Sequence, residues 1–172
     1  MTHSTLHTYS LLRMKTSLFV SLLFIIGIAT FVSCSESQVY KNFEDVKQFS
    51  WEQQDAKTFS FEIQQADVPH RVHIALRHIT ETPLNNVPVK YTITAPGGSE
   101  ETGTANIMLR DTETGKLLGE VAYQFTDIDK VVEENWTPKA AGNYTVTVSH
   151  NGQQDPVPTV MEVGLLVEKV QE

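Results

Sequence analysis

Apolar and polar residues alternate with a period of two along most of the chain after residue 57. The clearest alternating stretches cover residues 59–63, 72–78, 87–93, 144–148 and 161–167. Because successive side chains of a strand point to opposite faces, each stretch predicts a strand with one buried and one solvated face. Short strands with Gly, Pro and Asn between them predict an all-β fold, an antiparallel β-sandwich of about seven to nine strands. Jelly-roll and Ig-like arrangements both fit this pattern.

Turn residues mark two of the connections between these strands. Residues 96–99, with the sequence Pro-Gly-Gly-Ser, predict a turn. Residues 111–115 predict a hairpin connection in which Gly115 adopts a positive φ. We expect the strand that follows this connection to cover residues 117–125, where alternate positions form one face.

Two segments have a less regular pattern. Residues 127–134 predict a short helix, because Ile128, Val131 and Val132 form an apolar stripe at helical spacing. Residues 39–51 fit a helix by their spacing and a strand by their β-type composition, so both remain open for this segment.

The N-terminal segment has the layout of a bacterial lipoprotein signal. Arg13 and Lys15 precede an apolar run over residues 18–31, and the small residue Ser33 stands before Cys34. A positive region, an apolar region and a small residue before the cleavage site are the parts of a secretory signal. A lipoprotein signal peptidase requires a cysteine in the first mature position of its substrate, because the thiol of that cysteine receives a diacylglycerol before cleavage. We therefore predict that Cys34 carries the lipid.

Two other interpretations of this segment fit the sequence less well. About 14 apolar residues form a helix of about 21 Å, which is short of the roughly 30 Å hydrocarbon core and disfavours a transmembrane anchor. An ordinary signal peptide cut at another site would leave the cysteine without a role. We predict a signal peptide over residues 1–33, with Met14 as an alternative start. The lipidated cysteine and a short tether follow over residues 34–38, and one β-sandwich domain covers residues 39–172.

The charge of the chain excludes one class of partner. The 172 residues contain 13 basic and 21 acidic residues, and removal of residues 1–33 takes away two basic residues and no acidic one. The mature chain then has a net charge of about −10, which repels phosphate backbones, so we expect no nucleic-acid partner. Cys34 is the single cysteine, so its lipidation leaves no thiol for a disulfide, a zinc site or a nucleophile.

Three histidines lie close together in the sequence but do not predict a metal site. In a strand, His73 points to the opposite face from His70 and His78. His70 and His78 share a face but are separated by about 26 Å of extended chain. We expect these histidines to be solvated or hydrogen-bonded, with no metal and no cofactor.

No motif of the mature chain indicates catalysis. A nucleophile elbow and a phosphate-binding glycine loop are both missing from the sequence. The acidic pairs at residues 100–101 and 133–134 lie in predicted turns and indicate solvated charge. We therefore expect that the protein is not an enzyme.

Trp51 and Trp136 lie in turn-rich parts of the sequence. Either could form part of a face that binds a sugar or a partner. A tryptophan is more often part of a core, so we favour a structural role in which each closes one end of the sandwich.

Several segments, in order along nearly the whole mature chain, resemble the GldH family of gliding-motility lipoproteins. They are Val39-Tyr40, Trp51, Leu76-Arg77-His78, Pro83-Leu84-Asn85-Asn86-Val87, Gly115-Lys116-Leu117-Leu118-Gly119, Gly142-x-Tyr144 and residues 162–169. Thr82 and Leu84 replace aromatic residues of the family beside Pro83, and Leu117 replaces a tryptophan. Residues 151–154 replace the family's Met-Arg segment. None of these motifs is catalytic.

The resemblance implies a lipid-anchored cell-envelope protein that is needed for gliding and is associated with the type IX secretion apparatus. Its partners would be the membrane, through the lipid, and other gliding or secretion proteins. Candidate partner contacts or structural residues are Arg77, His78, Pro83, Asn86, Trp51 and Trp136. For Arg77, on the polar face of its strand, we favour an ion pair with an acid of a neighbouring strand.

The runner-up function is a carbohydrate-binding envelope lipoprotein, because β-sandwiches with exposed aromatic residues also bind sugars. The lipid would hold either protein on the cell membrane or the outer membrane. In bacteria of the Bacteroidetes type, export to the surface favours acidic residues directly after the lipidated cysteine. Only Glu36 fits that pattern among Ser35, Glu36 and Ser37, so a periplasmic and a surface-facing domain both stay open.

Overall fold

The computed structural model describes residues 37–171. The predicted signal peptide and the predicted lipid attachment at Cys34 lie outside the described residues. Within residues 37–171, no helix has the length and apolar character needed to cross a bilayer.

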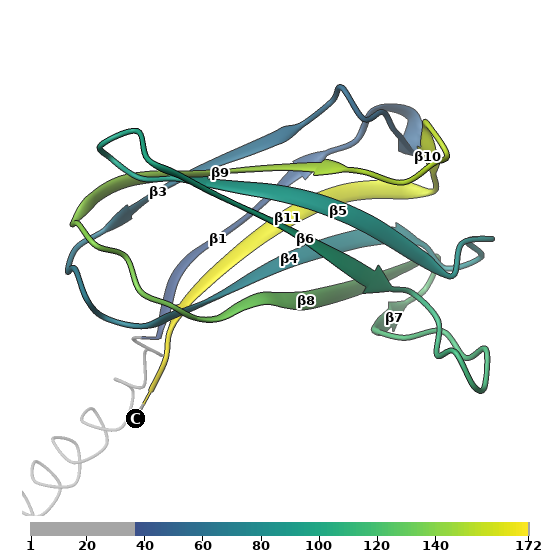
Figure 1. Ribbon diagram of the computed structural model, residues 1–172. Helices are drawn as coiled ribbons and strands as arrows, with labels where there is room; N and C mark the ends of the chain where they lie inside the picture. The colour runs from purple at the N-terminus through teal and green to yellow at the C-terminus, as the bar shows by residue number, and fades with distance from the viewer. Residues whose placement is uncertain (1–36, 172) are drawn as a thin grey trace, which may run out of the picture. The chain divides into compact units, whose positions relative to one another are not determined.

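Eleven strands and one short 3₁₀ turn make up this part of the chain (Figure 1). The strands are β1 (Gln38–Asp45), β2 (Ser50–Trp51), β3 (Lys57–Ile63), β4 (His70–Ile79), β5 (Asn86–Thr94), β6 (Glu100–Met108), β7 (Glu120–Ala122), β8 (Phe125–Trp136), β9 (Gly142–His150), β10 (Val157–Pro158) and β11 (Val160–Lys169). The 3₁₀ turn η1 covers Lys47–Phe49. The segment at residues 39–51, which fitted both a helix and a strand, is therefore a strand, this turn and a second short strand.

Two antiparallel sheets pack face to face, which confirms the predicted all-β sandwich. One sheet has the strand order β1-β11-β4-β8-β7, and the other has the order β3-β9-β5-β6. A two-stranded pair, β10-β2, lies beside them. Apart from the β5–β6 hairpin, which lies within one sheet, successive long strands alternate between the two sheets in the order of a jelly roll, which settles the choice that the sequence left open.

The core lies between the inner faces of the two sheets. Every alternating stretch of the sequence supplies buried residues to it, for example Phe59, Ile74, Val89, Val146 and Leu165. In each of these strands one row of side chains is buried and the other is exposed to solvent. This packing explains why apolar and polar residues alternate with a period of two in the sequence.

The predicted helix at residues 127–134 is wrong, because the segment lies inside the twelve-residue strand β8. β8 pairs with β4, and the pairing shifts register twice between Ile128 and Trp136. Ile128 and Val132 pack against the core, and their separation of four residues fits one face of a strand as well as one turn of a helix. Val131 does not belong to this inward row, so its apolar side chain only mimics a helical stripe.

The predicted strand at residues 117–125 is also wrong in its extent. Within this range β7 covers only three residues, a two-residue turn follows at Tyr123 and Gln124, and Phe125 already begins β8. Tyr123 has a φ of 61° and is 90% exposed, so it does not belong to an inward row.

Both predicted turns are confirmed. Gly98 has a φ of 80°, and the turn is closed by a hydrogen bond from Ala95 N to Ser99 O. Gly115 has a φ of 67°, as expected for its connection. Asp111 begins that connection with a side chain that accepts hydrogen bonds from the backbone N–H groups of Glu113 and Thr114, a common turn device.

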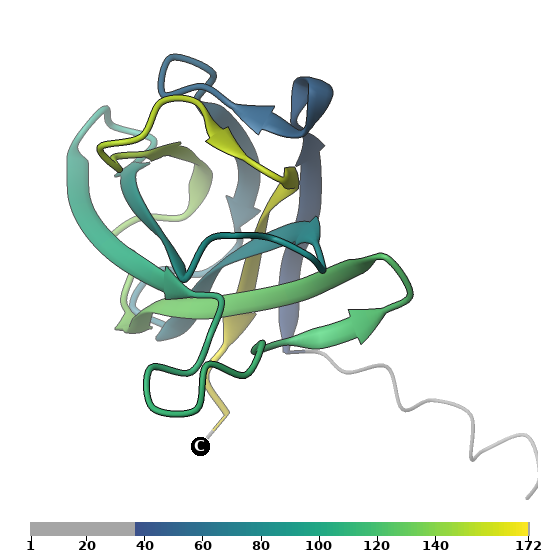
Figure 2. The same cartoon turned by 90° about the vertical axis from the view of Figure 1, so that its right-hand side faces the viewer.

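The chain enters the sandwich at one end, which we call the entry end. Ser37 O accepts a hydrogen bond from Lys169 N, so the first and last described segments lie side by side. The connections at residues 64–69, 95–99 and 137–141 lie at the same end (Figure 1). The opposite, distal end holds β2, β10 and the β7–β8 hairpin, and Figure 2 views the molecule from that side.

Candidate functional site

Arg77 lies at the centre of the outer face of the five-stranded sheet. Its strand, β4, runs between β11 and β8, and Arg77 pairs with Glu162 on one side and with Asp127 on the other. The same row continues to Asp45 on β1 and to Glu120 on β7. We call these five residues the acidic row, because four carboxylates flank one guanidinium.

Arg77 forms ion pairs with the acids on both neighbouring strands. Its Nε and Nη2 donate to the two carboxylate oxygens of Asp127 at 2.7 and 2.9 Å. Its Nη1 donates to Glu162 at 3.1 and 3.2 Å. The guanidinium carbon also lies 4.7 Å from the centre of the Phe125 ring, in a cation–π contact. The side chain is thus fixed by three strand neighbours.

The ion pairs change the pKa values of both partners. Hydrogen bonds from Arg77 hold the pKa of Asp127 below its usual value, although partial burial opposes this effect. Hydrogen bonds to Asp127 raise the pKa of Arg77. Both groups are therefore charged at neutral pH.

A shallow groove of about 600 Å³ crosses the same face beside Arg77. Phe43, Ala75 and Leu166 contribute its apolar part, and Lys41, Glu120 and Asp129 contribute charge. The ring of Phe43 lies directly over Gly164, where a Cβ atom would come within 2.5 Å of it. Glycine at this position lets the aromatic ring approach the sheet closely.

His73 lies two residues before Ala75 on the same face. Its Nδ1 is 2.7 Å from a carboxylate oxygen of Asp129, and its Nε2 is 3.9 Å from Glu168. The outer face therefore carries a second polar cluster, His73 with Asp129 and Glu168, and His73 lies two rows along β4 from Arg77.

His78 points to the opposite side of the sheet from Arg77. It is fully buried, and its Nδ1 donates to the carbonyl oxygen of Ile79 at 2.8 Å. Burial lowers the pKa of His78, so the ring is neutral at pH 7. No hydrogen-bond partner is present for its Nε2. His78 belongs to the core and cannot touch an external partner in this conformation.

Pro83 and Asn86 lie in and after the connection between β4 and β5. Pro83 is exposed, while Asn86 begins β5 and is half-buried. The neighbouring Thr82 is buried, and its carbonyl oxygen accepts a hydrogen bond from Arg110 at 3.0 Å. This connection is thereby held against the loop that follows β6.

The two tryptophans are buried at opposite ends of the sandwich. Trp51 is 0% exposed, donates from Nε1 to Asp55 O at 2.9 Å and packs edge-on against His150. Trp136 is 6% exposed and packs edge-on against Tyr144, with ring centres 5.1 Å apart. Neither ring presents a face on which a sugar could stack.

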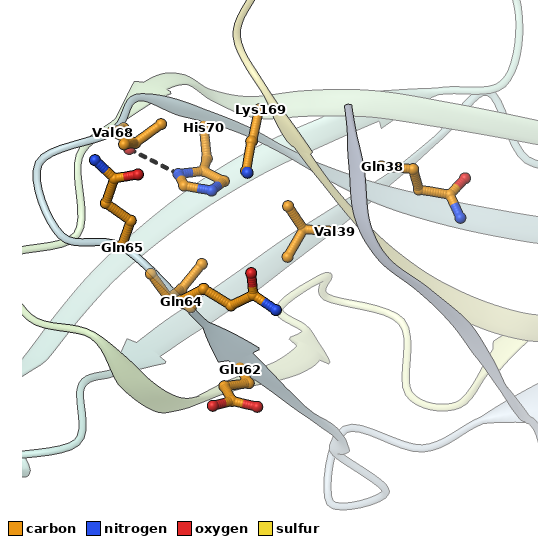
Figure 3. Close-up of a pocket in the computed structure, with 9 residues that line it drawn as sticks. Gln38, Val39, Glu62, Gln64, Gln65, Val68, His70 and Lys169 are labelled. Atoms are coloured by element: carbon orange, nitrogen blue, oxygen red, sulfur yellow. Dashed lines mark hydrogen bonds between the residues drawn. The ribbon is translucent and has the colours of Figure 1, made fainter. Parts of the chain in front are cut away.

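A small cavity lies at the entry end between β1, β3 and β4 (Figure 3). Its volume is about 220 Å³, and it is lined by Val39, Ile63, His70 and Lys169 among others. His70 Nδ1 donates to Val68 O at 2.7 Å, and burial lowers the pKa of the ring. The volume is below the range of about 300–1,000 Å³ that is usual for small-molecule sites.

The structure does not bring the six predicted site residues together. Arg77 lies on an outer face, His78 lies in the core beneath it, and the tryptophans close the two ends. The partners of Arg77, namely Asp127 and Glu162, were missed by the sequence reasoning. The alternation of Thr126, Asp127 and Ile128 was the signal that could have placed Asp127 on a strand opposite Arg77.

No group of three His, Cys, Asp or Glu side chains that could hold a metal ion occurs within residues 37–171. The outer face of the five-stranded sheet carries paired charges beside an apolar groove.

Solved structures match this chain at low similarity. A CocE/NonD family hydrolase from Staphylococcus aureus is 8% identical with a TM-score of 0.41, covering 78% of this chain and 34% of that one. A family 35 carbohydrate-binding module from Clostridium thermocellum is 12% identical with a TM-score of 0.33, over 67% and 95% of the two chains. Latent PorU from Porphyromonas gingivalis is 7% identical with a TM-score of 0.36, over 80% and 14%.

The chain spans about a third of the length of the hydrolase that it matches. No curated protein matches the sequence. A family match is much more informative, because the GldH lipoprotein pattern matches residues 38–167, which is almost the whole described domain. The protein belongs to the GldH lipoprotein family.

Proposed function

We propose that this protein is a lipid-anchored, non-enzymatic component of the gliding motility and type IX secretion apparatus, which acts by binding other envelope proteins. The observation that carries the proposal is the family match over residues 38–167. Attachment of the lipid at Cys34 is part of the proposal, because that cysteine follows a signal-like segment.

The described face of the five-stranded sheet supports a binding role. Its apolar groove is bordered by charge, a combination typical of protein interaction sites. The acidic row contains four carboxylates and one guanidinium, so it has an excess of negative charge. A partner with basic residues would complement it.

The alternative, a carbohydrate-binding lipoprotein, depended on Trp51 and Trp136 as exposed platforms. Both rings are buried, so that argument no longer supports sugar binding. A carbohydrate screen of the purified domain remains its direct test, and saturable binding to a glycan would revive it.

Gene deletion and replacement test the proposed function. Deletion should stop colony spreading on agar, and the wild-type gene should restore it; normal spreading of the deletion strain would contradict the proposal.

A Cys34→Ser variant tests the lipid separately. Each buried acyl methylene contributes about 0.8 kcal/mol, so two or more chains form a durable anchor that the variant would lack. The variant should leave the membrane fraction while its domain keeps its melting temperature. Retention of the variant in membranes would show that another segment or partner holds the protein.

A further inference from the structure

Strand β6 forms a free edge of the four-stranded sheet. It covers nine residues and pairs with β5 along its whole length without a bulge. Within the described part of the chain, no strand pairs with its other side. Figure 2 shows β6 at the outer margin of the molecule. Alternate N–H and C=O groups of β6 therefore face outward without a strand partner.

Proteins usually protect such edges with charge, proline, bulges or very short strands. β6 has none of these between Thr102 and Met108, where every side chain is uncharged and proline is absent. Its only acidic residues, Glu100 and Glu101, stand at the entry end of the strand.

The other edges of the two sheets are protected. β1 has a bulge near Tyr40 and carries Lys41, Glu44 and Asp45, and β3 carries Lys57 and Glu62. β1 contacts β3 on one side of the sandwich as β6 contacts β8 on the other, and neither contact is a strand pairing. β7 is three residues long. The part of β8 beyond β7 carries Asp129, Lys130, Glu133 and Glu134. The long, regular and uncharged edge of β6 is the exception among them.

The natural complement of a free strand edge is the backbone of another extended segment, which adds itself to the sheet through main-chain hydrogen bonds. Glu100 and Glu101 give this edge a negative end. A segment with basic residues near that end and small or β-branched residues along the rest would match it in charge and shape.

A second copy of this chain fits the edge poorly. In a parallel pair, Glu100 and Glu101 of both copies would lie side by side and repel each other. In an antiparallel pair, the entry ends of the two domains would point in opposite directions, away from a common membrane. Two chains with a formal net charge of −8 also repel each other.

We infer that β6 is the docking edge for an extended strand of a different envelope protein, with basic residues opposite Glu100 and Glu101. The inference rests on the proposed function, because it names the kind of contact through which this component joins the apparatus. Strand addition supplies affinity from backbone bonds, so it is compatible with the uncharged side chains of β6.

Paired lysine substitutions test the edge against a matched control. Thr102→Lys with Thr104→Lys places two charges on β6, which should block a basic strand. Thr92→Lys with Thr94→Lys places the same charges, at the same spacing and on the same face, on the inner strand β5. The β6 variant should reduce colony spreading to the level of the deletion strain, while the β5 variant spreads normally and both keep the wild-type melting temperature.

Photo-crosslinking in intact cells tests the geometry directly. A benzophenone amino acid is placed in the full-length lipoprotein at residue 102, 104 or 106, one position at a time. Strand pairing predicts that the three adducts fall within one segment of one partner, in steps of two residues. A basic residue should lie near the position opposite Glu101. The same probes at residues 92 and 94 should give no such series.

The possible outcomes separate the two proposals. Normal spreading of the deletion strain would defeat the proposed function. If deletion stops spreading but the β6 and β5 variants behave alike, only the inference about β6 fails. Adducts between two copies of this chain, adducts scattered over many sites, or no adduct at all would also overturn it.

Discussion

At the scale of single residues, Arg77 joins three strands of one sheet. Its guanidinium donates hydrogen bonds to both carboxylate oxygens of Asp127 on β8. It also forms an ion pair with Glu162 on β11, the neighbouring strand on the other side. A lysine could not reproduce this, because an ammonium group lacks the planar fork that binds two acids at once. The residue therefore holds the outer face in register and keeps two carboxylates from repelling each other.

Replacement of Arg77 by alanine should lower the free energy of unfolding by about 1–2 kcal/mol. The value is below that of a buried charge-assisted pair because the Arg77 side chain is 30% exposed. Urea denaturation measures this loss of free energy of unfolding.

The control is Arg71→Ala on the same strand and face. The ion pair of Arg71 with Glu134 is more exposed, at 42% and 66% for the two side chains. Arg71→Ala should cost less than about 0.5 kcal/mol. Equal losses for the two variants would contradict a special role for Arg77.

At the scale of elements, the packing of β1 on β11 depends on one glycine. Phe43 lies over Gly164, and an added Cβ atom would overlap the ring. Glycine is otherwise a poor strand residue, because it loses more backbone entropy and packs no side chain. Gly164 therefore has a low strand propensity, but it allows the close contact with the Phe43 ring.

Gly164→Ala should lower the free energy of unfolding by about 1–3 kcal/mol, the usual cost of overpacking. In a Phe43→Ala background the clash is absent, so the same change should be neutral or stabilising by up to about 1 kcal/mol. A double-mutant cycle by urea denaturation measures this difference. Equal effects of Gly164→Ala in both backgrounds would show that the ring does not constrain the position.

The sequence predicts the elements of this fold well where the alternation is uninterrupted. The strands that bury Phe59, Ile74, Val89 and Val146 follow from the period of two alone, and the turn at Gly115 follows from its chemistry. β8 was missed because Ile128 and Val132, four residues apart, fit a helix as well as a strand, and only the pairing with β4 decides between the two.

The site was less predictable than the fold. An acid pair for Arg77 could be expected from its place on a polar face. Which acids pair with it depends on the strand order. Asp127 on β8 and Glu162 on β11 are 50 and 85 residues away from Arg77 in the sequence, so local patterns do not identify them. The position of β6 along the chain likewise does not indicate that it is an edge strand of its sheet.

At the scale of the whole molecule, two buried histidines should make stability depend on pH. Burial lowers the pKa of both His70 and His78 below the ordinary value of 6.5. The folded state therefore binds fewer protons than the unfolded state as the pH falls through this region. By linkage, the stabilisation is complete above about pH 7 and is lost progressively on acidification.

Melting temperature should therefore fall between about pH 7.5 and pH 5.5. At lower pH, protonation of Asp127, whose pKa is lowered by Arg77, should add to the loss. Differential scanning calorimetry at several pH values measures the slope. His78→Gln should flatten the slope even if it lowers the melting temperature overall, whereas a melting temperature that rises on acidification would contradict the assignment.

The position of β1 has a mechanical consequence. Cys34 precedes Ser37 by only three residues, which span about 10 Å at most, so a lipid there would transmit load directly into β1. β1 runs antiparallel to β11 over Gln38–Asp45. A pull along the strand axis would strain all the hydrogen bonds between these strands together, in shear, instead of breaking them one after another. If the lipid holds the protein at β1 and a partner pulls on β6, the force would pass through the sandwich parallel to its strands. Strand pairs loaded in this direction resist separation more strongly than strand pairs that are peeled apart.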